Sequence, residues 1–175
     1  ITHALRIAHL IPNNRPHVIH IARANYSPST GETFPLEINQ TGIYVDAAAG
    51  VVFNAERNSK FFDIKAPTSD FTIQNIVFFN GQAEQGGVVS CNTCTLRVTN
   101  NRFIDNNASQ SGHVVHMEGG RLTFANNLLD NNGINSDSDT GAVIDIANAN
   151  SDTLQRDVVR NNTFYRNAHT NIRAG

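Results

Sequence analysis

The stretch "NNRFIDNN", residues 100–107, combines four asparagines with two large apolar residues in its middle. Two similar stretches follow, "NNLLDNN" from Asn126 and "NNTFYRN" from Asn161, and a weaker copy begins at Asn75. The three strong copies share the pattern N-N-x-(F/L)-x-x-N. A feature that recurs along a chain indicates a repeating architecture rather than a single surface loop.

A second motif lies between the asparagine blocks. It reads "GGVVSC" from Gly86, "GHVVHM" from Gly112 and "GAVIDI" from Gly141, at spacings of 26 and 29 residues. In each copy one polar residue separates two apolar residues, which is the period of a strand with one buried face. Weaker copies, "PLEI" and "FFDI", begin at Pro35 and Phe61.

These repeats predict the fold. A unit of about 25 residues with short strands buries its apolar face only when it is stacked on its neighbours. We therefore predict an all-β fold, a single-stranded right-handed parallel β-helix, or solenoid, of about six coils. The right-handed sense follows from the strong preference of parallel crossovers. The whole chain, 1–175, is expected to form one domain, with the coils in 16–175, as a piece of a larger protein.

The asparagine blocks are expected to be structural. The apolar residue of each block, Phe103, Leu129 or Phe164, is predicted to stack in the core. The first asparagines, Asn75, Asn100, Asn126 and Asn161, are predicted to form a ladder at one bend, where amides satisfy turn groups and one another. The second asparagine of each pair is expected to take the left-handed conformation.

The N-terminal segment has a different period. The apolar residues at helical spacing are Ala4, Ile7, Ala8 and Ile11, and Thr2 is a candidate cap. We predict a short amphipathic helix in residues 1–12. A solenoid needs its open end covered, because an exposed parallel edge recruits other chains.

Composition excludes several classes of function. Only 16% of residues are charged and the net charge is −2, without a basic stripe, so no nucleic-acid partner is expected. No apolar run approaches the ~20 residues that span a bilayer, so this segment is not expected to insert into a membrane. Cys91 and Cys94 in "CNTC" are expected to be a structural pair, bonded as a disulfide if the protein is exported.

Two resemblances extend this interpretation. The start, with "HVIHIARANYS" and "GETFPLEI", resembles a family of secreted bacterial and archaeal β-helix proteins of unassigned function over roughly residues 1–45, although Ala24 and Asn25 replace the usual Gly. From about 70 to 170, "GGVV", "GHVV", "GAVI", "FIDN" and "FYRN" resemble the repeats of polymorphic outer-membrane proteins, which are autotransporter adhesins; His113, Ala142 and "LLDN" depart from that pattern. The resemblances imply a β-helix and, for the second, adhesion.

One polar column carries the candidate chemistry. The residue between the two apolar positions of the second motif is predicted to point to solvent. By coil it is Glu37, Asp63, Ser90, His116, Asp145 and, in the last coil, Asn171. Outward strand positions are commonly polar simply because they are solvated.

Three functional interpretations of this column stay open. Ser90, His116 and Asp145 have the residue types of a nucleophile, a base and an orienting carboxylate, but a flat sheet offers no oxyanion hole. Glu37 and Asp63 are one coil apart and would be the carboxyl pair of a polysaccharide-degrading enzyme. Alternatively, the column, with His116 and Asp145, lines a strip that binds a glycan or a protein.

Two insertions, Ile134–Thr140 and Asn148–Thr153, are the best contact loops, because insertions in solenoids gather on the binding face. The candidate contact residues outside the column are Asp137, Asp139, Asn148, Asn150 and the exposed aromatic Tyr165. Asp137 and Asp139 also suggest calcium, but the loop lacks the glutamate ligand of an EF-hand and the glycine-rich pattern of calcium solenoids. No metal site and no cofactor are therefore expected.

The function expected from the sequence is binding without catalysis. We predict a secreted or surface-displayed microbial adhesin module that recognises a glycan or a cell-surface protein. Two alternatives stay open, a polysaccharide-degrading hydrolase or lyase of the phage-tailspike kind, and a structural stalk of a surface fibre. The oligomeric state is left open between a monomer and a homotrimer.

Overall fold

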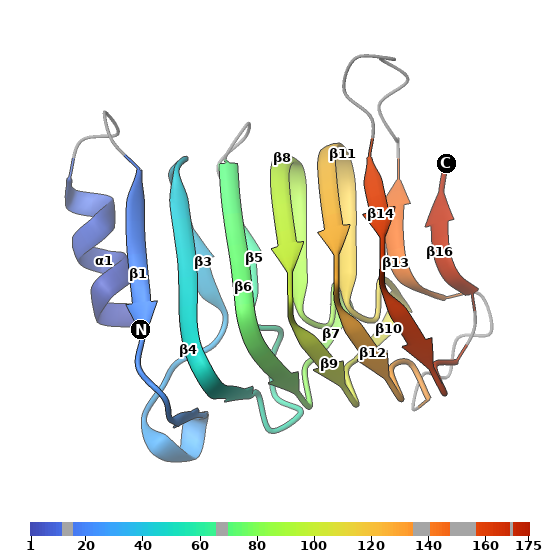
Figure 1. Ribbon diagram of the computed structural model, residues 1–175, viewed down its shortest axis with the longest axis horizontal. Helices are drawn as coiled ribbons and strands as arrows, with labels where there is room; N and C mark the ends of the chain where they lie inside the picture. Colours follow the sequence, from blue (N-terminus) through green and yellow to red (C-terminus); the bar gives the residue numbers. More distant parts are fainter. Residues whose placement is uncertain (12–15, 66–69, 135–140, 148–156, 169) are drawn as a thin grey trace.

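The computed structural model describes residues 1–11, 16–65, 70–134, 141–147, 157–168 and 170–175. Its strands stack as parallel coils along one axis, and an α-helix lies at the N-terminal end (Figure 1). The predicted parallel β-solenoid with an N-terminal helix is thus confirmed, and the right-handed sense stays a prediction. No helix in the described ranges has the length and apolarity to cross a bilayer.

Three faces run along the solenoid, each with six strands in the described part of the chain. The first face contains β3 (Leu36–Ile38), β5 (Phe62–Ile64), the start of β8 (Val89–Thr99), the start of β11 (Val115–Ala125), β13 (Ala142–Ala147) and β16 (Thr170–Ala174). The second contains β1 (His17–Ile21), the starts of β4 (Ile43–Asn54) and β6 (Asp70–Phe79), the ends of β8 and β11, and β14 (Val158–Arg160).

The third face contains β2 (Asn25–Tyr26), the ends of β4 and β6, β9 (Arg102–Ile104), β12 (Leu128–Asp130) and β15 (Thr163–Tyr165). A short parallel pair, β7 (Gln82–Gln85) with β10 (Asn107–Ser111), connects the third face to the first, and a 3-10 turn, η1, covers Pro28–Thr30. Long strands such as β8 and β11 therefore cross a bend and serve two faces.

The core confirms the predicted registers. Val89, Val115 and Ile144 are paired in neighbouring coils of the first face and are fully buried. On the third face the predicted stack continues through Phe103, Leu129 and Phe164. The Phe103 ring also lies parallel to the Phe78 ring of the preceding coil, with centroids 5.3 Å apart. The strand period therefore determined which side chains meet inside the solenoid.

The asparagine ladder is present, but the two asparagines of each pair exchange the predicted roles. The first asparagines, Asn75, Asn100, Asn126 and Asn161, are exposed and take the left-handed conformation. The second ones point inward. Asn127 Nδ2 donates to the Val98 carbonyl (3.0 Å), and its Oδ1 accepts the Asn101 backbone N–H (2.9 Å). The left-handed residue bends the chain from one face of the coil to the next, and this bend points the next side chain into the core.

A second ladder lies at the other end of the third face. Asn106, Asn132 and Asn167, the last asparagines of the repeat pattern, bond to one another in the same way. Gly81 holds the equivalent place in the earlier coil, where its N–H donates to Asn106 Oδ1 at 2.8 Å. Each ladder satisfies the backbone at one bend of the coils that carry the motif and of the coil before them.

The terminal helix α1 (Thr2–Leu10) covers the N-terminal end, as predicted, but it uses a different face. Leu5 and Ala8 are buried, whereas Ile7 and Ile11 are half exposed. Thr2 is not the cap; its hydroxyl hydrogen-bonds the Glu32 carboxylate at 2.5 Å, in the segment before β3. Gln40 Nε2 donates to the Ala8 carbonyl near the helix end (2.9 Å). Contacts with the first coil therefore set the rotation of the helix.

Cys91 and Cys94 are joined as a disulfide within β8. Both residues are buried, and the bridge spans the bend at which β8 passes from the first face to the second. Cys91 also borders a hollow on the first face.

Candidate functional site

The first face carries the predicted polar column, with one correction. The strand registers place Glu37, Asp63, Ser90, His116 and Asp145 side by side in successive coils. In the last coil the partner of Asp145 is Arg173, not Asn171. The apolar Ile172 pairs with Ile144, so Arg173 takes the outward position. The column therefore ends on a cation.

The C-terminal end of this column is closed rather than solvated. The Arg173 guanidinium bonds both oxygens of Asp145 at 2.7 and 2.8 Å, and His116 Nδ1 lies 3.2 Å from Asp145 Oδ2. Asp145 is only 1% exposed and His116 only 6%. Burial raises the pKa of Asp145, but the hydrogen bonds from Arg173 and Ser111 outweigh it and hold the pKa below its usual range. Asp145 is therefore not solvated, contrary to the prediction for this column, and its contact with a ligand stays a prediction.

The N-terminal end of the column is an ion-pair cluster. Lys65 Nζ bonds the Glu37 carboxylate and lies 3.8 Å from Asp63 Oδ2. The hydrogen bond and charge of Lys65 lower the pKa of Glu37. A glycosidase needs one carboxylic acid that keeps its proton near neutral pH, which requires a raised pKa. The pKa of Glu37 is shifted in the opposite direction, so Glu37 does not have the property of such an acid.

The middle of the column borders a hollow of about 370 Å³. Its polar lining is Asp63, Lys65, Gln85, Ser90, Asn92, His116 and Glu118. Lys60 Nζ donates to Ser90 Oγ at 2.7 Å, and Ser90 Oγ donates to Asp63 Oδ1 at 3.2 Å. Ser90 thus bonds Lys60 and Asp63 rather than His116, which separates the three residues of the predicted triad.

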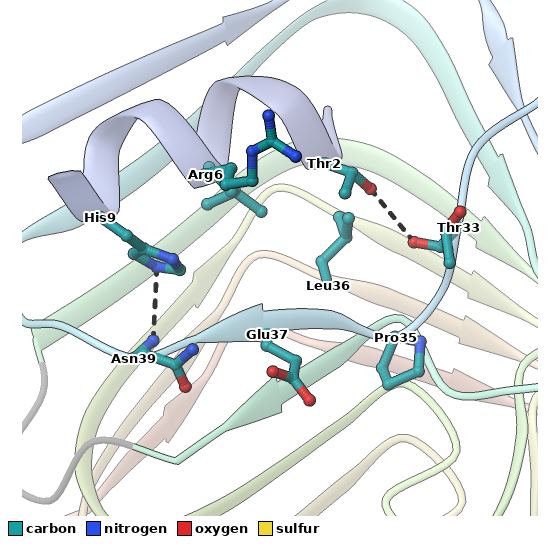
Figure 2. A pocket seen from close by; sticks show the side chains of 9 residues that line it. Thr2, Arg6, His9, Thr33, Pro35, Leu36, Glu37 and Asn39 are labelled. Carbon is teal, nitrogen blue, oxygen red and sulfur yellow. Dashed lines mark hydrogen bonds between the residues drawn. The ribbon is translucent and has the colours of Figure 1, made fainter.

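A second hollow, of about 330 Å³, lies between α1 and β3 (Figure 2). Glu37 lies at its edge, and Leu5, Leu36 and Pro35 supply apolar walls. The Asn39 backbone N–H donates to His9 Nε2 at 3.4 Å, so part of the rim is tied to the cap. Burial lowers the pKa of His9, with a smaller opposing effect from Glu37. This hollow thus lies where the capping helix packs against the first coil.

A third hollow, of about 470 Å³, lies on the second face. Strand registers place Tyr44, Thr72, Arg97 and Thr123 side by side in four successive coils. Asp46, Gln74 and Thr99 form a second column two positions further along the strands. Both columns line the hollow, so it combines one half-buried aromatic ring with hydroxyl, amide and charged groups.

The polar groups of this hollow are held in place. Asp46 Oδ1 accepts from Gln74 Nε2 at 2.8 Å and from Asn75 Nδ2 at 3.2 Å, and Arg97 Nε lies 3.7 Å from Asp70 Oδ1. Within the described ranges, the buried Thr72 Oγ1 has no hydrogen-bond partner. This oxygen is closed off from solvent, so a molecule in the hollow does not reach it.

Other predicted site residues fall outside these hollows. Tyr165 is exposed on the third face, with the Arg166 guanidinium 4.7 Å above its ring, and so lies on a different face from the polar column. Asp137, Asp139, Asn148 and Asn150 lie outside the described residues, as does most of both proposed contact loops. Among the described residues, no group of three His, Cys, Asp or Glu side chains is placed to hold a metal ion.

The sequence shows Tyr44 as an outward aromatic residue, but it does not show the polar side chains that surround it. Tyr44 alternates outward between buried Ile43 and Val45, which is a visible signal. Arg97 and Gln74 join it only through the registers between coils. No protein-family model matches the chain, and no curated protein or solved structure is significantly similar to it.

Proposed function

We propose that this chain is a carbohydrate-binding module that does not cleave the glycan it binds, and that the hollow around Tyr44 receives one or more sugar rings. The observation that carries the proposal is the combination in this hollow of an aromatic ring with ordered polar groups. The hollow, at about 470 Å³, lies within the range of about 300–1,000 Å³ typical of ligand sites. The proposed role is that of an adhesin, extracellular or displayed on a microbial surface.

The chemistry of the hollow matches a saccharide. A pyranose ring has an apolar face of C–H groups and a rim of hydroxyls. The Tyr44 ring offers an amphipathic surface for the apolar face. Around it, Arg97 and Gln74 carry N–H donors, and Thr99 and Thr123 carry hydroxyls. The repeat of coils about 4.8 Å apart presents such groups in a row, which suits an extended chain.

Binding is favoured over cleavage by the state of the carboxylates. The Glu37 and Asp63 pair shares Lys65, and the pKa of Glu37 is lowered by that cation. The Asp145 carboxylate is buried under Arg173. Neither Glu37 nor Asp145 thus has the raised pKa of a carboxylic acid that protonates a glycosidic oxygen. The resemblance of the repeats to polymorphic outer-membrane adhesins points in the same direction.

The test is a polysaccharide panel assayed for bound protein and for new reducing ends in the same samples. Tyr44→Ala is expected to weaken binding about fivefold, because an aromatic stacking contact contributes about 1 kcal/mol. Tyr165→Ala is the matched control, since it removes an exposed tyrosine from another face. It is expected to leave the affinity unchanged.

Each possible result of this assay supports a different functional interpretation. Retention that depends on Tyr44 and produces no new ends supports the proposal. Retention that depends on Tyr165 instead moves the site to the third face. New ends that disappear in Glu37→Gln or Asp63→Asn identify a polysaccharide-degrading enzyme. If nothing on a broad panel is retained, the carbohydrate module is excluded and the stalk becomes the better interpretation.

A further inference from the structure

The hollow on the first face contains a serine in an unusual setting. Ser90 Oγ lies 2.7 Å from Lys60 Nζ and 3.2 Å from Asp63 Oδ1. Ser90 borders the hollow of about 370 Å³, whereas Lys60 is not part of its lining. The hydroxyl therefore faces open space with an amine next to it, which is the arrangement of a nucleophile backed by its base.

The environment of Lys60 suits a base. Burial lowers the pKa of the Lys60 ammonium, and the charges of Asp63 and Glu84 oppose this only in part. The other lysine of this face, Lys65, has the opposite shift, because its hydrogen bond and charge interaction with Glu37 raise the pKa of its ammonium. Lys60 therefore loses its proton at a lower pH than Lys65 does. A neutral lysine accepts a proton from a neighbouring serine, as in known serine–lysine sites.

We propose that Ser90 and Lys60 form a nucleophile–base pair that hydrolyses small carboxylic esters, such as an acetyl group carried on an alcohol. The amide side chains of Gln85 and Asn92 line the same hollow and carry the N–H donors that an oxyanion requires. This reaction does not depend on saccharide binding at Tyr44, which lies on a different face.

The proposed reaction balances in two steps. Rotation about the Ser90 Cβ–Oγ bond turns the hydroxyl proton from Asp63 to the neutral Lys60 amine. Oγ then bonds the ester carbonyl carbon, Lys60 takes the proton, and the alkoxide leaves with that proton as the C–O bond breaks. Water then attacks the carbonyl carbon of the acyl-serine and gives a proton to Lys60. The bond between that carbon and Ser90 Oγ breaks, and Oγ takes the proton from Lys60. The net reaction converts an ester and water into an acid and an alcohol.

The experiment uses p-nitrophenyl acetate as the probe, with release of nitrophenol and peptide mass mapping as readouts. The wild type is expected to gain one acetyl group on Ser90, and Ser90→Ala is expected to lose it. Lys60→Arg keeps the positive charge but cannot act as a base, so acetylation is expected to slow about 100-fold. Lys60→Met is expected to behave in the same way.

Arg102→Met is the control, because Arg102 is an exposed cation on the third face and does not line the hollow. It is expected to keep the wild-type rate. The rate of acetylation should rise with pH as Lys60 loses its proton. The groups that face Lys60 and influence this titration are Asp63 and Glu84 and, across the hollow, Lys65, His116 and Glu118. Thermal melting verifies that each variant is folded. Absence of an adduct on Ser90 in the wild type, or an unchanged rate in Lys60→Arg, would overturn the proposal.

Discussion

At the scale of single residues, neighbouring asparagines of identical chemistry have opposite roles. Asn126 is exposed and left-handed, whereas Asn127 is buried and bonded to the coils on either side. The left-handed residue supplies the sharp turn, and the residue after it supplies hydrogen bonds for the backbone at the bend. The same pairing of roles recurs in each coil that has the motif.

This division predicts different costs for two adjacent substitutions. Asn127→Ala leaves the Asn101 N–H and the Val98 carbonyl without their side-chain partners in the core. We expect a loss of about 2–4 kcal/mol in the free energy of unfolding, measured in urea. Asn126→Gly keeps a residue that adopts positive φ, so its effect is expected to stay within about 1 kcal/mol. Equal costs at the two positions would contradict the ladder described above.

At the scale of elements, the cap α1 depends on only part of its apolar surface. Leu5 is buried against the first coil, but Leu10 is 80% exposed. Helical periodicity showed that a helix forms, yet it could not choose between overlapping apolar faces, because the sequence offers several. The choice was made by contacts with β3 and β1 and by bonds to Glu32 and Gln40.

The effect of a substitution in α1 should depend on how deeply the replaced side chain is buried. Leu5→Ala is expected to cost about 2–3 kcal/mol and to loosen the cap, because it empties a fully packed position. An uncovered end of a parallel solenoid exposes a strand edge, so the variant should also self-associate in light scattering. Leu10→Ala is the matched control and should change neither quantity. Unchanged scattering in Leu5→Ala would show that α1 does not protect the end.

At the scale of the whole molecule, stability is distributed coil by coil. Each coil contacts its neighbours in the stack, so a solenoid behaves as a row of units with nearest-neighbour interfaces. The stacked residue Phe103 has coils on both sides and is 1% exposed, whereas the equivalent Phe164 in the last coil is only partly buried. The position of a residue in the stack therefore determines how much it contributes to the free energy of unfolding.

The same truncation should consequently cost more in the middle than at the end. Phe103→Ala is expected to lower the free energy of unfolding by about 3–5 kcal/mol, and Phe164→Ala by about 1–2 kcal/mol. Native-state hydrogen exchange provides the second readout. Phe164→Ala should speed exchange in β15 and β16 alone, while Phe103→Ala should affect the central coils. A uniform effect of Phe164→Ala along the chain would indicate one cooperative unit instead.

The sequence by itself determined the repeat, the strand registers of the core and the presence of a terminal helix. These follow from local rules, since a period of two residues assigns inward and outward positions and equal spacing aligns them between coils. The outward column from Glu37 to Asp145 was predictable for the same reason. Only the tertiary structure decided which asparagine turns inward, that Arg173 closes over Asp145, and that Lys60 reaches Ser90. These depend on the direction of each bend and on contacts between residues in different coils, which no period within one strand encodes.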